Sequence, residues 1–192
     1  MFDQVTNLFV ANKIIQEKDK DLYVYGLKQG VIMILQTSIL LLIGILWGMW
    51  WQSILFIFSF TPLRLSAGGI HASRQWLCFV CTTVHFIIVL LTIQYVELTD
   101  LSIVGIIILS TMIIFFLAPI EDMNKPFDDI ERVIFTKRTR IILAIELSIV
   151  LTLVFIDLKE AAECISITHV TMMIMVVLGS LKNTRYIKAH GK

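Results

Sequence analysis

Long apolar stretches separated by short polar segments dominate the pattern of this chain. Five stretches lack Asp, Glu, Lys and Arg apart from Glu146, and they are residues 29–63, 75–96, 101–120, 141–156 and 164–181. A helix of about 20 mostly apolar residues crosses a bilayer, so each of the last four stretches predicts one span. The first is too long for a single span. Residues 48–53 interrupt it with Trp50 and Trp51, which favour the headgroup region, and divide it into spans over 29–47 and 51–63.

The pattern therefore predicts an all-α integral membrane protein with six transmembrane helices. Composition agrees, because 57% of the 192 residues are hydrophobic and only 16% are charged, too few for the surface of a soluble domain. We interpret the chain as a single membrane domain, residues 1–192. Its parts are an interfacial helix and linker (1–28), spans one to four with a polar loop at 64–78 (29–118), a second polar loop (119–140), spans five and six (141–181) and a tail (182–192).

The distribution of basic residues predicts the orientation of these spans. Of the 16 Lys and Arg residues, all except Lys159 fall in segments on the same side as the N-terminus. Cytoplasmic loops carry an excess of Lys and Arg, so we expect both termini and the 64–74 loop in the cytoplasm. Acidic residues share these loops and leave a net charge of only +1. We therefore expect neither a polybasic lipid-binding cluster nor a nucleic-acid-binding surface.

Two further helices are predicted outside the spans. Residues 2–18 place apolar side chains on one helical stripe, namely Phe2, Val5, Leu8, Phe9 and Ile15. This segment fits a helix that lies in the membrane interface or one that packs on a cytoplasmic loop. Residues 127–140 carry charges of both signs after Pro126 and are expected to be helical.

The segment from residue 64 to residue 78 carries the most chemistry. Gly68 and Gly69 permit a sharp turn or a close backbone approach. Ser73 is a plausible N-cap for the next span, which would place Cys78 in the second helical turn. A helix N-terminus and a nearby imidazolium both favour a thiolate, so Cys78 and His71 form a candidate nucleophile and acid–base pair.

The spacing of this pair imposes a geometric condition. Seven residues of straight helix rise roughly 10.5 Å, so one continuous helix would hold His71 and Cys78 apart. Contact requires the chain to fold back between Gly69 and Ser73. Spacing alone leaves a simpler interpretation open, in which the cysteine is a small buried hydrophobe and Arg64 and Arg74 anchor the membrane boundary.

Two other classes of function compete with catalysis at this stage. Cys78, Cys81 and His85 form a C-x2-C-x3-H pattern on one helix, which with His169 suggests a small transporter or metal-handling protein. A metal site would need further ligands from elsewhere, so we expect none. A non-catalytic membrane scaffold is the third alternative. Three cysteines do not form a disulfide framework.

Polar groups inside the spans need partners. Glu146 lies within the fifth span, and an ionisable residue there is a functional hypothesis by default. It is expected to orient His71 or to pair with Arg64 or Arg74. His85 and His169 are expected to satisfy each other or a backbone carbonyl.

These residues resemble the accessory gene regulator protein B family, the membrane peptidases of peptide quorum sensing in Gram-positive bacteria. The family pattern R-x3-G-G-x-H-x6-C is matched by Arg64, Gly68, Gly69, His71 and Cys78. A second element, A-P-x4-N-K-P, resembles Ala118-Pro119 followed by Asn124-Lys125-Pro126, and Tyr25-Gly26-Leu27 is also similar. The resemblance covers most of the chain.

The resemblance implies a cysteine endopeptidase of the cell membrane with His71 and Cys78 as its catalytic pair, supported by Arg64, Gly68, Gly69 and Glu146. It implies a precursor peptide with an amphipathic leader and an acidic tail, which the enzyme removes while the signal segment closes into a thiolactone or lactone ring. It further suggests a homodimer and no cofactor. An acidic tail would be attracted by four basic residues, Lys125, Lys137, Arg138 and Arg140.

Overall fold

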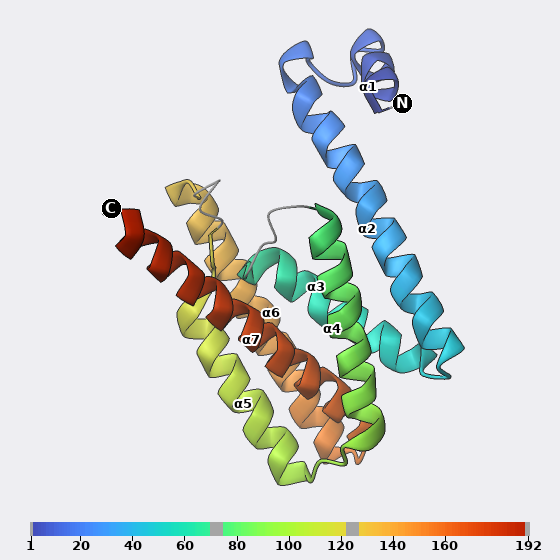
Figure 1. The fold of residues 1–192 in the computed structure, drawn as a ribbon, viewed down its shortest axis with the longest axis vertical. Helices are drawn as coiled ribbons and strands as arrows, with labels where there is room; N and C mark the ends of the chain where they lie inside the picture. Colours follow the sequence, from blue (N-terminus) through green and yellow to red (C-terminus); the bar gives the residue numbers. More distant parts are fainter. Residues whose placement is uncertain (1, 70–74, 122–126, 191–192) are drawn as a thin grey trace. The chain divides into compact units, whose positions relative to one another are not determined.

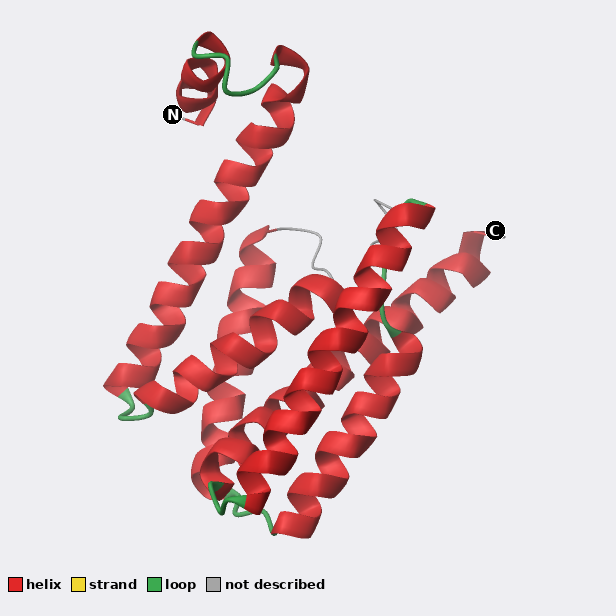
Figure 2. Ribbon diagram, turned by 180° about the vertical axis from the view of Figure 1, so that it is seen from behind, coloured by secondary structure: helices red, strands yellow, loops and turns green. Residues whose placement is uncertain are grey.

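The computed structural model describes residues 2–69, 75–121 and 127–190 and shows seven α-helices and one short 3-10 helix within them (Figure 1). The helices are α1 (Phe2–Ala11), α2 (Lys20–Leu46), α3 (Trp50–Ala67), α4 (Gln75–Tyr95), α5 (Asp100–Leu117), α6 (Asp129–Phe155) and α7 (Lys159–His190), with the 3-10 helix η1 at Glu17–Asp19. Figure 2 shows helices joined by loops, and no strand, in the described part of the chain. The all-α prediction is confirmed.

The first compact unit covers residues 1–43 and contains α1, η1 and most of α2. Helix α1 ends at Ala11, so the single helix predicted over residues 2–18 is wrong beyond that point. The physical cause is local: Lys13 adopts φ 56°, a left-handed conformation that terminates a helix. The Leu8 carbonyl accepts from both the backbone N–H and the side-chain amide of Asn12, at 3.0 and 2.8 Å, which fixes the last turn of the helix.

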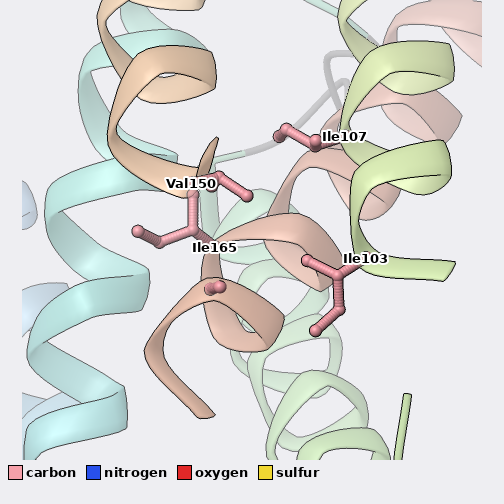
Figure 3. Packing of buried hydrophobic residues seen from close by; sticks show 5 residues of the cluster. Ile103, Ile107, Val150 and Ile165 are labelled. Atoms are coloured by element: carbon pink, nitrogen blue, oxygen red, sulfur yellow. The ribbon is translucent and has the colours of Figure 1, made fainter. Parts of the chain in front are cut away.

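The second unit, residues 44–192, is a helical bundle built around α7. This helix contacts α3, α4, α5 and α6, and its residues 162–169 are all buried. Ile103 and Ile107 of α5, Val150 of α6 and Ile165 of α7 form an apolar cluster with Ala162 (Figure 3). The outer faces are also apolar, since α5 exposes Leu101 and Phe116 almost fully. A bundle that is apolar on both sides fits a lipid environment.

Four helical segments are long and apolar enough to cross a membrane, counted over the described residues: Glu17–Leu46, Cys78–Tyr95, Asp100–Leu117 and Lys159–Arg185. Helices α3 and α6 fall outside this set. Helix α3 contains Gln52, Pro62 and Arg64, and α6 carries Arg138, Arg140 and Glu146. The predicted break near residue 48 is confirmed, because α2 ends at Leu46 and α3 begins at Trp50. Six spans and cytoplasmic termini stay predictions.

Helix α6 joins two segments that the sequence pattern separates. The pattern places residues 129–140 in the 119–140 loop and residues 141–156 in the fifth span, but one helix of 27 residues covers both. It starts at a capping box: the Asp129 N–H donates to Asp128 Oδ1 at 2.7 Å, and the Asp128 N–H donates to Glu131 Oε2 at 3.3 Å. Reciprocal bonds of this kind satisfy the open donors of a helix start.

Replacing Asp128 by alanine is expected to lower the free energy of unfolding by about 1 kcal/mol, because the cap accepts from otherwise unpaired backbone donors. Asp128→Asn retains an acceptor and should stay near the wild type. Thermal unfolding of the purified protein in detergent, followed by far-UV circular dichroism, measures both. Equal loss in the two variants would mean that the charge, rather than the cap, stabilises the start of α6.

Candidate active site

The site begins at the end of α3, where the backbone turns sharply. Gly68 follows the last helical residue with φ 71° and Gly69 has φ 122°, both in the region that favours glycine. Arg64, one turn back on α3, donates from its guanidinium to the Gly68 carbonyl. A side-chain donor on a carbonyl at the C-terminus of a helix stabilises that end, so Arg64 holds the turn in place.

A segment distant in sequence closes over this turn. The Ile120 N–H donates to the Ala67 carbonyl at 2.9 Å, and Gly68 and Ile120 form an isolated parallel bridge. A Cβ atom on Gly68 would collide with the Ile120 carbonyl oxygen, so the contact requires glycine. Ile120 directly follows Ala118-Pro119, whose peptide bond is cis. The arginine–glycine and alanine–proline motifs therefore meet.

Gly69 is held from a third side by α7. A Cβ atom on Gly69 would lie 3.0 Å from Arg64 Nη1 and 3.3 Å from the carbonyl oxygen of Met175. The turn is thus packed between the α7 backbone, the Arg64 guanidinium and the segment after α5. Both glycines are therefore explained by the close approach of other atoms, as the sequence suggested. The chain that follows Gly69 thus starts from a fixed position.

Cys78 lies at the end of the first turn of α4, which begins at Gln75. Its thiol is free and half-buried. Thr82 donates to the Cys78 carbonyl at 2.9 Å, within the helix. The Arg64 guanidinium, which fixes the glycine turn, also interacts electrostatically with Cys78.

Four residues with predicted roles lie outside the described residues. His71 and Arg74 lie within residues 70–74, outside the described residues, as does the Ser73 cap. The fold-back of His71 toward Cys78 therefore stays a prediction. Lys125, proposed for an acidic tail, lies outside the described residues too.

The other two cysteines have different surroundings. Cys81 is exposed, and Cys164 on α7 is buried with its sulfur 3.5 Å from the Gln52 carbonyl oxygen. His85, one turn beyond Cys81, has its ring 5.9 Å from that of Phe60. Across the described ranges, no three His, Cys, Asp or Glu side chains gather in a way that could hold a metal ion.

Glu146 has a partner that the sequence did not suggest. Its Oε2 lies 2.5 Å from Nε2 of His169, while Nδ1 of the same ring lies 3.5 Å from Thr111 Oγ1. His169 thus pairs with Glu146 and not with His85, whereas a contact of Glu146 with His71, Arg64 or Arg74 stays a prediction. Sequence reasoning missed the Glu146–His169 pair because depth within two separate spans does not show which helix faces which.

The remaining basic residues lie along the first half of α6. Lys137, Arg138 and Arg140 are exposed, and the Arg140 guanidinium lies 4.5 Å from the centre of the Phe115 ring. Two surface hollows lie beside these residues. One of about 550 Å³ is lined by Arg132, Lys137 and Arg140, and the other, of about 290 Å³, by Arg138 with Pro62 and Leu65 among others.

Glu121 is a structural residue that sequence reasoning did not identify. Its carboxylate forms an ion pair with Arg132 of α6 and accepts from the Phe127 N–H at 3.4 Å. Its backbone carbonyl accepts from Asn183 of α7 at 2.9 Å. Glu121 thereby ties the segment after α5 to two helices. The sequence could have indicated this role, because Glu121 directly follows Ala118-Pro119-Ile120.

These features define a helical membrane protein with a half-buried cysteine in the first turn of one helix and an arginine that fixes a glycine turn and interacts electrostatically with that cysteine. The accessory gene regulator B family model matches residues 2–177, and the chain therefore belongs to that family. It is also similar to a putative AgrB-like protein of Clostridium beijerinckii, with 30% identity over 133 residues. That match covers 67% of this chain and 63% of the relative, just under two thirds of its length. No solved structure matches the chain.

Proposed function

We propose that this protein is a membrane-embedded cysteine endopeptidase that removes the C-terminal tail of a precursor signal peptide and promotes closure of the signal segment into a ring. Family membership supports peptide processing in quorum sensing as the setting. The observation that carries the chemistry is the position of Cys78. Cys78 lies in the first turn of α4 and interacts electrostatically with Arg64, which is itself hydrogen-bonded to the glycine turn.

Cys78 is the nucleophile in this proposal. The thiolate attacks the scissile carbonyl of the peptide, and the electron pair of the C–N bond leaves with the amine of the tail. Arg64 stabilises the thiolate before the attack and is not consumed. The product of this step is a thioester between Cys78 and the new C-terminus of the signal segment.

His71 is the general acid and base. It follows the anchored Gly69 by only two residues, and Cys78 follows the first described residue of α4 by three. His71 takes the proton of the Cys78 thiol and gives it to the departing amine, which would otherwise be a poor leaving group. The fixed glycine turn supports this role because it limits where the following loop can start.

Ring closure resolves the thioester. A thiol or hydroxyl group within the bound peptide attacks the thioester carbonyl, loses its proton to His71 and releases the Cys78 thiolate. Holding this group next to the carbonyl raises its effective concentration. A site at the membrane boundary limits water and suppresses the competing hydrolysis. The product is a thiolactone when the attacking group is a thiol and a lactone when it is a hydroxyl.

The proposed substrate features follow from the position of the site at the membrane boundary. An amphipathic leader would let the precursor reach the site along the membrane interface. The acidic tail is complementary to the basic face of α6, where Lys137 and Arg140 line one hollow and Arg138 the other; Lys125 is proposed to add to it. We also propose that the enzyme lies in the cell membrane of a Gram-positive bacterium and acts as a homodimer.

Trapping the acyl-enzyme tests this proposal. The probe is a precursor peptide with an amphipathic leader and an acidic tail, in which the ring-forming residue is replaced by alanine so that the thioester is not resolved. Mass spectrometry of the protein should show one peptide adduct on Cys78 that hydroxylamine removes. Cys78→Ser should give an adduct that resists neutral hydroxylamine, or none. An adduct on Cys81, or release of the tail without any adduct, would contradict the proposal.

A further inference from the structure

A buried polar pair lies inside the bundle, apart from Cys78. His169 of α7 is fully buried and Glu146 of α6 is 7% exposed, with their side chains 2.5 Å apart. Thr111 of α5 lies against the other ring nitrogen. Three helices therefore contribute to one contact, and the proposed peptidase chemistry uses neither residue. Ionisable groups at such positions in membrane proteins are expensive and mark ion or proton binding.

A row of buried oxygen atoms leads away from this pair along α7. Ser166 and Glu163 precede His169 by three and six residues, so each step along the helix is about 4.5 Å. Ser166 is fully buried and Glu163 is 8% exposed. Ser166 Oγ and Glu163 Oε1 have no hydrogen-bond partner among the described residues. Buried polar atoms of this kind are normally satisfied by water.

The row is interrupted in the opposite direction. On α6, the next buried polar residue toward the α3–α4 turn is Thr139, two turns from Glu146, and buried Leu143 lies between them. On α7, fully buried Met172 and Val176 follow His169 on that side, together with buried Thr171, whose hydroxyl is engaged with the Thr168 carbonyl at 2.6 Å. Apolar side chains thus close the pair off from the end of the bundle that holds Gly69, whereas hydroxyl and carboxyl groups continue toward the end that holds Glu163.

We propose that Glu146 and His169 form a proton-binding site that exchanges with water through Ser166 and Glu163 at one end of the bundle only. The ligand is the proton. In the neutral state the pair holds one proton between carboxylate and imidazole. Uptake of a second proton leaves Glu146 neutral and His169 as imidazolium, and release of the proton leaves Glu146 as carboxylate and His169 neutral.

The other ionisable groups of the packed helices are placed away from the pair. On α4 the relevant group is His85, beside Phe60, and on α3 it is Arg64, which interacts with His85 and Cys78. On α5 the charged residue is Asp100, at its start and paired with Lys159 at 2.9 Å. On α6 the charged residues nearest to Glu146 along the helix are Arg138 and Arg140, about two turns away, and on α7 the one nearest to His169 is Glu163, at the far end of the row. The proton therefore belongs to the pair.

Infrared difference spectroscopy of the whole protein in lipid nanodiscs, recorded between pH 5 and pH 9, measures proton exchange at a carboxyl group. We expect one carboxyl band that is lost in Glu146→Gln, shifted in His169→Gln and kept in Glu160→Gln, which removes an exposed carboxyl from the same bundle end. Glu146→Asp retains a carboxyl and should keep a displaced band if the glutamine variant folds poorly. A wild-type spectrum with no band that depends on Glu146 would overturn the site.

One-sided access is tested by cysteine labelling in a chain whose native cysteines are replaced by alanine. Ser166→Cys should react with a small cationic methanethiosulfonate reagent at least tenfold faster than Val176→Cys, because only the former lies on the polar row. Both positions are fully buried, so burial alone predicts equal rates. Equal labelling rates would overturn the path. Neither measurement uses peptide cleavage, so both can be interpreted even if the proposed peptidase activity is absent.

Discussion

Replacing Cys78 by alanine is expected to reduce removal of the precursor tail at least about 1000-fold, since loss of a nucleophile leaves only binding and electrostatic effects. No neighbouring thiol can take over: Cys81 is on the exposed side of α4, and Cys164 is buried beside Gln52. Co-expression of the variant with a precursor peptide, followed by mass spectrometry of the tail fragment, measures the loss.

Cys81→Ala is the matched control for this experiment, because it removes a thiol one turn further along the same helix. It should retain cleavage within about twofold of the wild type, since an exposed cysteine behaves as a small surface residue. Circular dichroism and gel filtration in detergent establish that both variants fold. Activity in Cys78→Ala together with loss in Cys81→Ala would assign the nucleophile to the wrong cysteine.

The fold shows what hydropathy can and cannot predict. Apolar stretches report which residues avoid water, so they locate α3, α4 and α5 within a few residues. Helix α2, however, begins at Lys20 and not at residue 29, and α7 runs to His190 and not to residue 181. They do not report where a helix ends. Helix α6 begins at Asp129 because Asp128 and Glu131 cap it there, well before its charges stop. Helix α1 ends early because Lys13 has a positive φ, although Ile15 extends the apolar stripe.

The candidate site could be predicted as a set of residues and not as an arrangement. The two glycines, Arg64 and Cys78 can be identified because their types and spacing suggest a turn and an activated thiol. Their geometry depends on Ile120 and Met175, which are ordinary apolar residues contributing only backbone atoms at the turn. A sequence pattern does not predict contacts made by backbone atoms, because many different side chains are compatible with the same backbone position.

The buried pair illustrates the same limit for charged groups. The sequence marks Glu146 as unusual, but its partner depends on which faces of α6 and α7 meet, and the apolar pattern of a helix buried on all sides does not define a face. Residues 162–169 of α7 are such a case. The pairing with His169 therefore required the tertiary structure, as did the role of Glu121 in joining the segment after α5 to Arg132 and Asn183.

Replacing Gly68 by alanine is expected to be among the most damaging single changes in the described part of the chain. Its φ of 71° is strained for any residue with a Cβ atom, at a cost of about 1–3 kcal/mol, and the new methyl group would also push against the Ile120 carbonyl. Relief of that contact moves the turn from which the His71 loop starts, so we expect tail cleavage to fall at least tenfold even where the protein folds.

Gly105→Ala provides the control, because Gly105 lies within α5 and a Cβ atom added to it would meet no other atom within 4 Å. Alanine favours a helix over glycine by roughly 0.5–1 kcal/mol, so this variant should unfold at a slightly higher temperature and keep its cleavage rate. Thermal unfolding in detergent and the co-expression assay are applied to both variants. If Gly68→Ala matched Gly105→Ala in both measurements, the contact between the glycine turn and Ile120 would have no part in positioning the nucleophile, and Arg64 alone would have to set the geometry at Cys78.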